Sequence, residues 1–458
     1  MIGVQVSKIG ITIFGSTGDL TYRKLMPALY NLFSRGLLKD NFDICAIGRR
    51  DYSNKDYTDI IRSWIEKFAR LEVTEEKLLE FFDHINYLKM DFTKEEDFEV
   101  LNNYYKNNDI DNHLVYLAVS PTFFEEIAVG IEKTNCIKNP KIILEKPFGD
   151  SLENAAYLSK RLDSVFGKDN IYRIDHYLGK EMVRNILTIR TNNHMISNVW
   201  DKSSIDSIHI SALETVGIDG RVSYYDETGA LMDMVTNHLL QILTIVAMDD
   251  PLGNIHEQQY NVLKDLRPVE DVSKSMILGQ YEDYEVVGSD TETYAALKLF
   301  IDNDRWKDVP FFIRTGKKCD NREVEVAINF KRKFSDIDPD VLIIKVQPTE
   351  GVYLEFNIKT PGEESGVTRA KMEFCQSCDD IFRRNTPEAY ERMILASLEG
   401  DDSWFSKWNQ IELSWKFIEE LKRKYKEANL PVYIYKAGSS GPKESNNLAD
   451  TEDQRWRT

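Results

Sequence analysis

The sequence predicts an α/β domain with a doubly wound parallel sheet at residues 1–174, followed by an α+β domain at residues 175–458 with a large, mainly antiparallel sheet and covering helices. In the first part, short β-branched apolar runs alternate with helical patterns, which is typical of parallel βαβ units. In the second part, strand-like segments alternate in polarity and follow one another through short turns, which favours antiparallel pairing. A length of 458 residues is compatible with about two to four domains.

The chain is acidic, with 58 Lys and Arg against 76 Asp and Glu and a net charge of −18. A chain with this net charge does not attract nucleic acid or anionic lipid as a whole. If it binds an anionic ligand, positively charged residues at the binding site must provide the attraction. No apolar run reaches the ~18 residues of a membrane span, and we expect no signal peptide. Five scattered cysteines, an odd number, suit a reducing cytoplasm. The C-x-x-C of Cys375 and Cys378 favours a structural role over a redox or zinc one.

The first predicted strand, at residues 9–14, leads into a candidate nucleotide site. A glycine turn follows it, and then a helical pattern that closes near Gly36. Glycines let the backbone approach a pyrophosphate, and a helix N-terminus offers free N–H groups and a positive dipole end. The usual G-x-G-x-x-G is incomplete at Thr17, so an ordinary tight turn is the alternative. The candidate cofactor-binding residues of this Rossmann-like turn are Gly15, Ser16, Thr17, Gly18, Asp19 and Leu20.

The second predicted strand, at residues 43–47, ends in two arginines, Arg49 and Arg50. An enzyme that uses NAD usually has an acid here to hold the ribose 2′-hydroxyl. Guanidinium groups suit a 2′-phosphate instead. The pattern therefore favours NADP, with NAD kept as an alternative cofactor. Without the glycine turn, a solvated strand end would be the better interpretation of these arginines.

Later strands of the first domain also lead into polar residues. The predicted strands at residues 87–90, 114–119 and 141–144 are followed by Asp91, Ser120 and Lys146. Ligands bind beyond the carboxyl ends of strands in such sheets, so these three residues are further candidates for cofactor binding. Pro147 favours extended backbone at Lys146, which would hold its ammonium at the sheet edge.

Residues 173–181, with the sequence Arg-Ile-Asp-His-Tyr-Leu-Gly-Lys-Glu, contain a dense group of reactive side chains. We expect a last strand at residues 171–174 and a helix at residues 180–188. His176 and Lys180 then lie near a helix N-terminus, which is a natural phosphate site, and Tyr177 can add a hydroxyl. Neighbouring residues do not share a face, so Asp175 can orient another group.

Several long motifs in one order resemble the glucose-6-phosphate dehydrogenase family. The resemblance rests on GSTGDLTYRKL at 15–25, EKPFG at 145–149, RIDHYLGKE at 173–181, YYDETGALMD at 224–233, NHLLQ at 237–241, RW at 305–306 and VPFFIRTGK at 309–317. It implies NADP-dependent oxidation of D-glucose 6-phosphate at C1 to 6-phospho-D-glucono-1,5-lactone, the first oxidative step of the pentose phosphate pathway. It also implies a homodimer or higher homo-oligomer. Together with the cysteine pattern we expect a cytoplasmic protein, and we expect no metal.

The resemblance identifies His238 as the general base, which takes the C1 hydroxyl proton as hydride leaves for nicotinamide C4. Asp175 is then the acid that orients His238 and stabilises its charged form. Taken alone, a histidine in an apolar helix is more often a core residue.

The substrate residues that the resemblance implies fall into two groups. His176, Tyr177 and Lys180 are expected to bind the 6-phosphate. The residues expected at the sugar hydroxyls, or closing the pocket, are Lys146, Glu214, Asp233 and Lys317, with Arg322 at a further basic position. Composition alone leaves surface carboxylates as the alternative for Glu214 and Asp233.

The second domain departs from the family pattern at three positions. Many members carry an arginine where this chain has Met232. Some members hold a second, structural NADP with basic residues where this chain has Glu323 and Ala327, so we expect a single NADP. We also expect the polar tail at residues 435–458 to be partly mobile. A catalytically silent sugar-phosphate or nucleotide sensor on the same fold is the rival interpretation.

Overall fold

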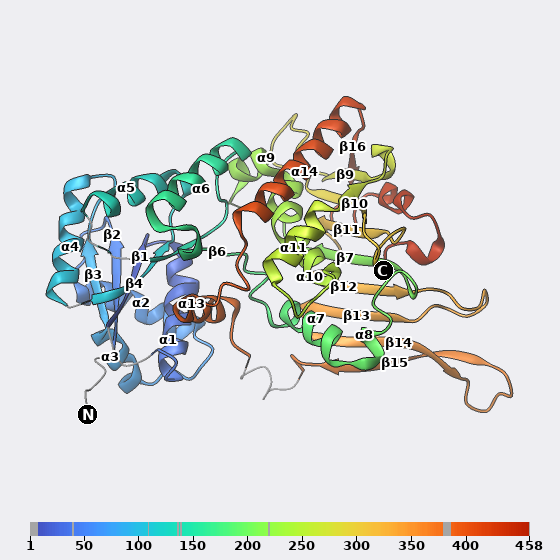
Figure 1. Ribbon diagram of the computed structural model, residues 1–458, viewed down its shortest axis with the longest axis horizontal. Coiled ribbons are helices and arrows are strands. Elements are labelled where there is room, and N and C mark those ends of the chain that lie inside the picture. Colours follow the sequence, from blue (N-terminus) through green and yellow to red (C-terminus); the bar gives the residue numbers. More distant parts are fainter. Residues whose placement is uncertain are drawn as a thin grey trace. The chain divides into compact units, whose positions relative to one another are not determined.

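The computed structural model describes residues 8–38, 41–108, 110–134, 137, 140–218, 220–378 and 386–457. The chain forms two compact units (Figure 1). The first contains Met1–Gly179 and Pro387–Trp408, and the second contains Lys180–Thr386 and Asn409–Thr458. Cys136 lies outside the described residues.

The first unit contains a six-stranded sheet in the order β3-β2-β1-β4-β5-β6, and all its neighbours are parallel. Its strands are β1 (Lys8–Phe14), β2 (Phe42–Gly48), β3 (Ile85–Lys89), β4 (Ile110–Leu117), β5 (Lys141–Leu144) and β6 (Ile171–Arg173). Its main helices are η1 (Thr21–Leu25), α1 (Met26–Ser34), α2 (Asn54–Phe68), α3 (Glu75–Asp83), α4 (Phe98–Asn107), α5 (Phe124–Thr134) and α6 (Leu152–Phe166). The predicted doubly wound parallel sheet is confirmed.

This strand order explains where the first unit can hold a ligand. The chain moves outward from β1 to β3 and then returns to β4 on the other side of β1, so the order reverses between β1 and β4. A doubly wound sheet binds its ligand at such a switch point, beyond the carboxyl ends of the strands. The turn after β1 and the start of the segment after β4 lie at that edge.

The structure differs from the predicted division because a late segment returns to the first unit. Helix α13 (Ala389–Glu399) belongs to that segment and contacts α1. Within α13, Glu391 is buried, accepts a hydrogen bond from Asn31 at 3.0 Å and pairs with Arg70 at 2.8 Å. A buried carboxylate needs such partners to offset its desolvation. The compact units also divide after Gly179, whereas the sequence placed the boundary after residue 174.

The second unit is built on a ten-stranded sheet in the order β15-β14-β13-β12-β7-β11-β10-β9-β16, with β8 paired to β10. Only the pairs β7–β11 and β9–β16 are parallel among these described strands, so the predicted mainly antiparallel sheet is confirmed. The strands are β7 (Ile205–Leu213), β8 (Leu266–Pro268), β9 (Met276–Tyr281), β10 (Tyr294–Ile301), β11 (Phe311–Gly316), β12 (Glu323–Phe330), β13 (Val341–Gln347), β14 (Gly351–Lys359), β15 (Val367–Cys375) and β16 (Val432–Tyr435).

A helical layer lies against this sheet through contacts of α7 with β13 and of η5 with β11 (Figure 1). Its helices are α7 (Glu181–Asn192), α9 (Val222–Ala230), η5 (Leu231–Leu239), α10 (Leu240–Ala247), α11 (Ile255–Lys264) and α14 (Trp408–Glu427). Among the described residues, one helical stretch, Val222–Ala247, has the length and apolar character to cross a membrane, and 89% of its apolar window is buried within the fold. Burial of that kind is typical of a core helix.

The C-terminal tail is packed, which corrects the expectation of partial mobility for its described residues. Strand β16 pairs in parallel with β9, and the Asp450 carboxylate pairs with Lys298 at 2.5 Å. The Trp456 ring packs against His209 and Phe312, and the Arg314 guanidinium lies 4.8 Å from its centroid. The sequence suggested mobility because the tail is polar, but its aromatic and charged side chains contact strands far away in the sequence.

Candidate active site

The glycine turn after β1 has the geometry expected of a nucleotide cradle. Gly15 has φ of +87°, and a Cβ there would lie 2.3 Å from the carbonyl oxygen of Ala118. Only glycine fits this combination of conformation and close approach. The Gly18 N–H donates to the Gly15 carbonyl at 3.0 Å, and the Thr21 hydroxyl donates to the same carbonyl at 3.1 Å. These contacts close the turn just before a helix N-terminus, which is a kind of position where phosphates can bind.

The remaining turn residues occupy different environments. Ser16 is fully buried, and its N–H donates to the Ile47 carbonyl of β2 at 2.9 Å. Asp19 pairs with Arg23 at 2.7 Å on the exposed side of the helix start. Thr17 and Leu20 are partly buried. The incomplete glycine pattern at Thr17 has therefore not prevented the turn from closing between β1, β2 and the following helix.

The structure places three predicted cofactor residues beyond strand ends. Arg49 is exposed directly after β2, and Ser120 is exposed at the start of the short helix that follows β4. Asp91 follows β3 and accepts hydrogen bonds from the N–H and hydroxyl of Thr93. The Thr93 hydroxyl is the main cause that lowers the pKa of Asp91 from its usual value.

Lys146 follows β5 and is partly buried, and it is joined to Pro147 by a cis peptide bond. Its neighbour Glu145, which the sequence reasoning missed, has the more unusual environment. The Tyr116 hydroxyl donates to Glu145 at 2.5 Å, and Tyr390 also hydrogen-bonds to this carboxyl. Burial raises the pKa of Glu145 to about 7. No motif pairs Glu145 with Tyr390, because Tyr390 comes from the returning helix α13.

Asp175 and its neighbours leave β6 as a tight turn in the first unit. Asp175 is 4% exposed and accepts a hydrogen bond from the Tyr177 N–H at 2.9 Å, and the Leu178 N–H donates to its carbonyl at 3.0 Å. Tyr177 is buried and its ring centroid lies 4.7 Å from that of His176, which is partly buried. These hydrogen bonds fix the backbone of the turn that carries the carboxylate of Asp175 and the imidazole of His176.

Lys180 precedes helix α7 in the second unit, at the position expected from the sequence. Its ammonium donates to the side-chain oxygen of Gln347, the last residue of β13, and it is partly buried. The Lys180 charge also lowers the pKa of the Glu350 carboxyl, although burial is the larger effect and raises it overall. Gln347 and Glu350 are two neighbours of Lys180 that the sequence reasoning did not identify.

His238 and Asp233 lie on η5, a wide helix with π-type hydrogen bonding. His238 is 1% exposed and Asp233 is 5% exposed. In a π-helix each N–H bonds five residues back, so residues five apart lie on one side of the helix. The side-chain amide of Asn237 also donates to the Met232 carbonyl, five residues earlier, at 2.8 Å. Wide turns of this kind are frequent at functional sites.

Glu214 and Lys317, which come from segments following β7 and β11, form a partly buried ion pair in the second unit. Lys317 is 3% exposed, and its ammonium lies 5.7 Å from the centroid of the Tyr225 ring. Burial, followed by the charge of Asp233, raises the pKa of Tyr225 well above its usual value. The fold therefore gathers three residues predicted to meet sugar hydroxyls around one buried phenol, which the sequence reasoning missed.

Arg322 differs from these residues because it is exposed just before β12. Within the second unit, the structure thus brings Glu214, Asp233 and Lys317 together and leaves Arg322 at the surface. The remaining predicted substrate residues, Lys146, His176 and Tyr177, belong to the first unit.

The fold and these side chains are typical of one class of protein. It is an oxidoreductase with one unit that binds a dinucleotide and a second unit that holds a cluster of polar side chains. The family description "Glucose-6-phosphate dehydrogenase, NAD binding domain" matches residues 12–185, and "Glucose-6-phosphate dehydrogenase, C-terminal domain" matches residues 187–457. The chain belongs to the glucose-6-phosphate dehydrogenase family.

Similar proteins cover nearly the whole chain. A glucose-6-phosphate 1-dehydrogenase of Borreliella burgdorferi is 38% identical, over 99% of this chain and 99% of the relative, and one of Bacillus subtilis is 34% identical over the same shares. Among solved structures, a glucose-6-phosphate dehydrogenase in complex with its substrate glucose-6-phosphate has a TM-score of 0.87 and 32% identity, covering 95% of this chain and 96% of that one. The predicted family is confirmed.

Proposed function

We propose that this chain oxidises D-glucose 6-phosphate at C1 to 6-phospho-D-glucono-1,5-lactone and passes hydride to C4 of the nicotinamide of NADP. The observation that carries the proposal is a polar group of the second unit. Buried Lys317 pairs with partly buried Glu214 beside the Tyr225 ring, the charge of buried Asp233 acts on Tyr225, and His238 lies on the same wide helix as Asp233. Carboxylates and an ammonium that are held in a buried site suit the many hydroxyls of a sugar. The names of the relatives support the same substrate.

His238 acts as the general base in this proposal. It accepts the proton of the C1 hydroxyl while the C1 hydrogen leaves as hydride, and Asp175 orients the imidazole and stabilises its charged form. The nicotinamide supplies the hydride acceptor when it is bound. The tight turn at Asp175 supports this orienting role, because the Tyr177 N–H donates to one oxygen of the Asp175 carboxylate and so limits the rotation of this side chain.

The phosphate of the substrate is held by His176, Tyr177 and Lys180, with Lys146 and Arg322 as further cations near the sugar. Lys180 stands at the N-terminus of a helix of 12 residues, where the helix dipole also favours an anion. Its neighbour Gln347 keeps the ammonium in place. Because the chain carries a net charge of −18, these local cations have to overcome repulsion of the anionic substrate.

The test of the reaction is absorbance at the reduced-nicotinamide band with glucose 6-phosphate and NADP. A wild-type chain that gives no signal would contradict the enzyme and favour the rival sugar-phosphate sensor. His238→Asn is expected to lower kcat by about 10²–10⁴, because the base is lost, while substrate binding is largely kept. More than a tenth of the wild-type activity in this variant would disprove the role of His238.

NADP is the preferred cofactor in this proposal because Arg49 is exposed beyond β2, where the 2′-phosphate of a dinucleotide would lie. Arg49→Ala is expected to raise the KM for NADP by about tenfold or more and to leave the KM for NAD nearly unchanged, since a charge-assisted pair contributes about 1.5–3 kcal/mol. Steady-state kinetics with both cofactors measure this. An equal effect on NAD would contradict a 2′-phosphate contact.

We further propose a cytoplasmic homodimer or higher homo-oligomer that binds one NADP per subunit and no metal. The outermost strand β15 exposes Val367, Met372 and Phe374, which is unusual for a strand that stays in water and suits an interface. Glu323 and Ala327 lack the cations that a second dinucleotide would need. Light scattering gives the subunit number, and equilibrium dialysis that finds two tight NADP per subunit would overturn the single site.

A further inference from the structure

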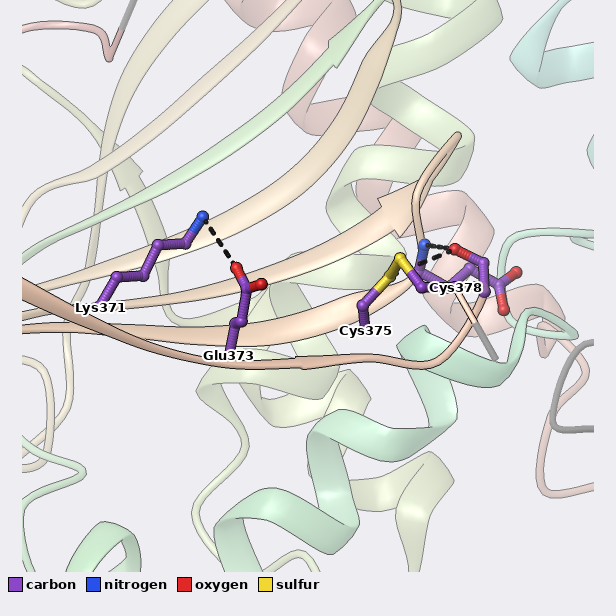
Figure 2. Close-up of a disulfide and its surroundings, with 6 residues drawn as sticks. Lys371, Glu373, Cys375 and Cys378 are labelled. Carbon is purple, nitrogen blue, oxygen red and sulfur yellow. Dashed lines mark hydrogen bonds and ion pairs between the residues drawn. A yellow bond between two sulfur atoms is a disulfide. The ribbon is translucent and has the colours of Figure 1, made fainter. Parts of the chain in front are cut away.

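A disulfide between Cys375 and Cys378 closes the turn at the end of β15 (Figure 2). Cys378 is exposed and Cys375 is partly buried, whereas Cys45 and Cys319, which keep their thiols, are buried. A C-x-x-C pair that solvent can reach is the arrangement in which thiol–disulfide exchange is feasible. The sequence favoured a structural role for this pair, and the structure adds that it is oxidised and accessible.

The turn that this disulfide closes holds Glu350 by its backbone. The N–H groups of Gln376 and Ser377 donate to the Glu350 carbonyl at 2.8 and 3.3 Å. The Glu350 N–H donates in return to the Ser377 hydroxyl at 3.0 Å. These three hydrogen bonds tie the two residues inside the disulfide ring to the connection between β13 and β14, which therefore depends on the closed turn for its position.

The same connection leads to Lys180. Gln347, at its start, accepts a hydrogen bond from the Lys180 ammonium, and Glu350, near its end, is close enough for the Lys180 charge to lower its pKa against the effect of burial. Lys180, the cation proposed to bind the substrate phosphate, is thus positioned by the connection between β13 and β14. The disulfide-closed turn holds the same connection at Glu350. All of these residues belong to the second unit.

We propose that Cys375 and Cys378 form a redox site that controls the affinity of the enzyme for its phosphorylated sugar, a proposal that rests on the function proposed for Lys180. In the oxidised state the closed turn holds Gln347 and Glu350 in place and so preorganises Lys180 for the phosphate. Preorganisation of this kind favours binding because less conformational freedom is lost when the ligand arrives. In the reduced state the turn is open and Lys180 is less well positioned.

The reductant is a dithiol. One of its thiolates attacks the exposed sulfur of Cys378, which breaks the disulfide, forms a mixed disulfide and releases Cys375 as a thiolate that takes up a proton. The second thiol of the reductant then attacks the mixed disulfide, releases Cys378 as a thiol and leaves as a cyclic or protein disulfide. The cysteine pair gains two electrons and two protons, and the dithiol loses the same number.

Dithiothreitol, applied to the folded wild-type chain, is the probe. Alkylation followed by mass spectrometry is expected to find two thiols more per chain after treatment, both within the peptide that contains residues 375–378. The KM for glucose 6-phosphate is expected to rise about three- to tenfold, with kcat within about twofold and the KM for the nicotinamide cofactor unchanged, because only preorganisation of the anchor is lost. Absence of the two additional thiols would overturn the redox site.

The variant Cys375→Ser with Cys378→Ser separates this effect from other consequences of the reductant. It is expected to show the KM of the reduced enzyme and no response to dithiothreitol, whereas Cys45→Ala, which removes a buried thiol of the first unit, keeps the full response. A response that persists in the double variant, or an unchanged KM in reduced wild type, would overturn the proposal. Lack of turnover in both redox states would instead contradict the proposed function, since the thiol count does not depend on activity.

Discussion

At the scale of single residues, Glu145 shows how burial changes the chemistry of a group next to a proposed ligand contact. It directly precedes Lys146, and burial raises its pKa to about 7, while the Tyr116 hydroxyl and the Lys146 charge act in the opposite direction. The same burial, with the charge of Glu145, raises the pKa of Tyr116 well above its usual value. Tyr116 therefore stays a hydrogen-bond donor, and Glu145 can exchange a proton near neutral pH.

Glu145→Gln tests this environment through the pH dependence of stability. Between the ordinary pKa of about 4.5 and the folded value of about 7, the folded chain holds the Glu145 proton more tightly than the unfolded chain, so this residue's contribution to stability falls as the pH rises. Glutamine does not titrate, so the variant is expected to gain on the order of 1–3 kcal/mol relative to wild type between pH 5 and pH 8. Unfolding curves of both proteins at the two pH values measure the difference. A difference that does not change with pH would contradict the raised pKa.

At the scale of elements, the helix that carries Asp233 and His238 depends on a special start. Gly229 has φ of +67° and ψ of 176°, and the Glu292 carboxylate accepts a hydrogen bond from the Leu231 N–H at 3.2 Å. Glu292 is 2% exposed and pairs with Lys422 at 3.4 Å. A buried carboxylate thus satisfies the N–H of Leu231 at the beginning of η5 and complements the helix dipole.

Gly229→Ala is expected to disturb this start and therefore the helix that carries the proposed base His238. A Cβ at position 229 would lie 2.3 Å from a Glu292 carboxylate oxygen, and the backbone conformation is one that almost only glycine adopts. We expect a loss of about 1–3 kcal/mol in stability and a fall in kcat larger than the change in cofactor KM. Gly288→Ala is the control, because its φ is +81° but a Cβ there meets no atom within 4 Å. Equal effects of the two substitutions on kcat would contradict the role of the Glu292 contact.

The elements also show where sequence patterns were sufficient. Strand β5, which has a strong apolar run, coincides with the predicted range 141–144. The π-type turns of η5 were not predicted, because a hydrophobic pattern distinguishes a helix from a strand but does not distinguish one helix type from another.

At the scale of the whole chain, the sequence could not predict contacts that join distant segments. Motifs that resemble a known family identified the turn at Gly15, the Asp175 segment and His238, because each is continuous in the sequence. The return of Pro387–Trp408 to the first unit, which supplies Tyr390 to Glu145, leaves no local signal. The same holds for the tail, whose polar composition hides contacts that only the folded sheet creates.

Trp456→Ala tests whether the tail stabilises the sheet of the second unit. The Trp456 ring is partly buried against His209 and Phe312, and Arg314 lies over it while donating to the Arg457 carbonyl at 3.1 Å. Removing this ring uncovers buried residues of β7 and β11, so the variant is expected to lose about 1–3 kcal/mol, less than a fully buried tryptophan would.

Amide hydrogen exchange localises the effect of Trp456→Ala, with faster exchange expected in β7 and β11 and no change in β1 and β4 of the first unit. Arg455→Ala is the matched control in the same tail. Its side chain is exposed and pairs with Glu452 three residues away, an interaction that contributes about 0–1 kcal/mol. If both substitutions left exchange in β7 and β11 unchanged, the tail would lie on the sheet without stabilising it. Faster exchange in the tryptophan variant alone assigns the stabilisation to the ring that covers His209, the residue whose burial lowers its pKa to about 3.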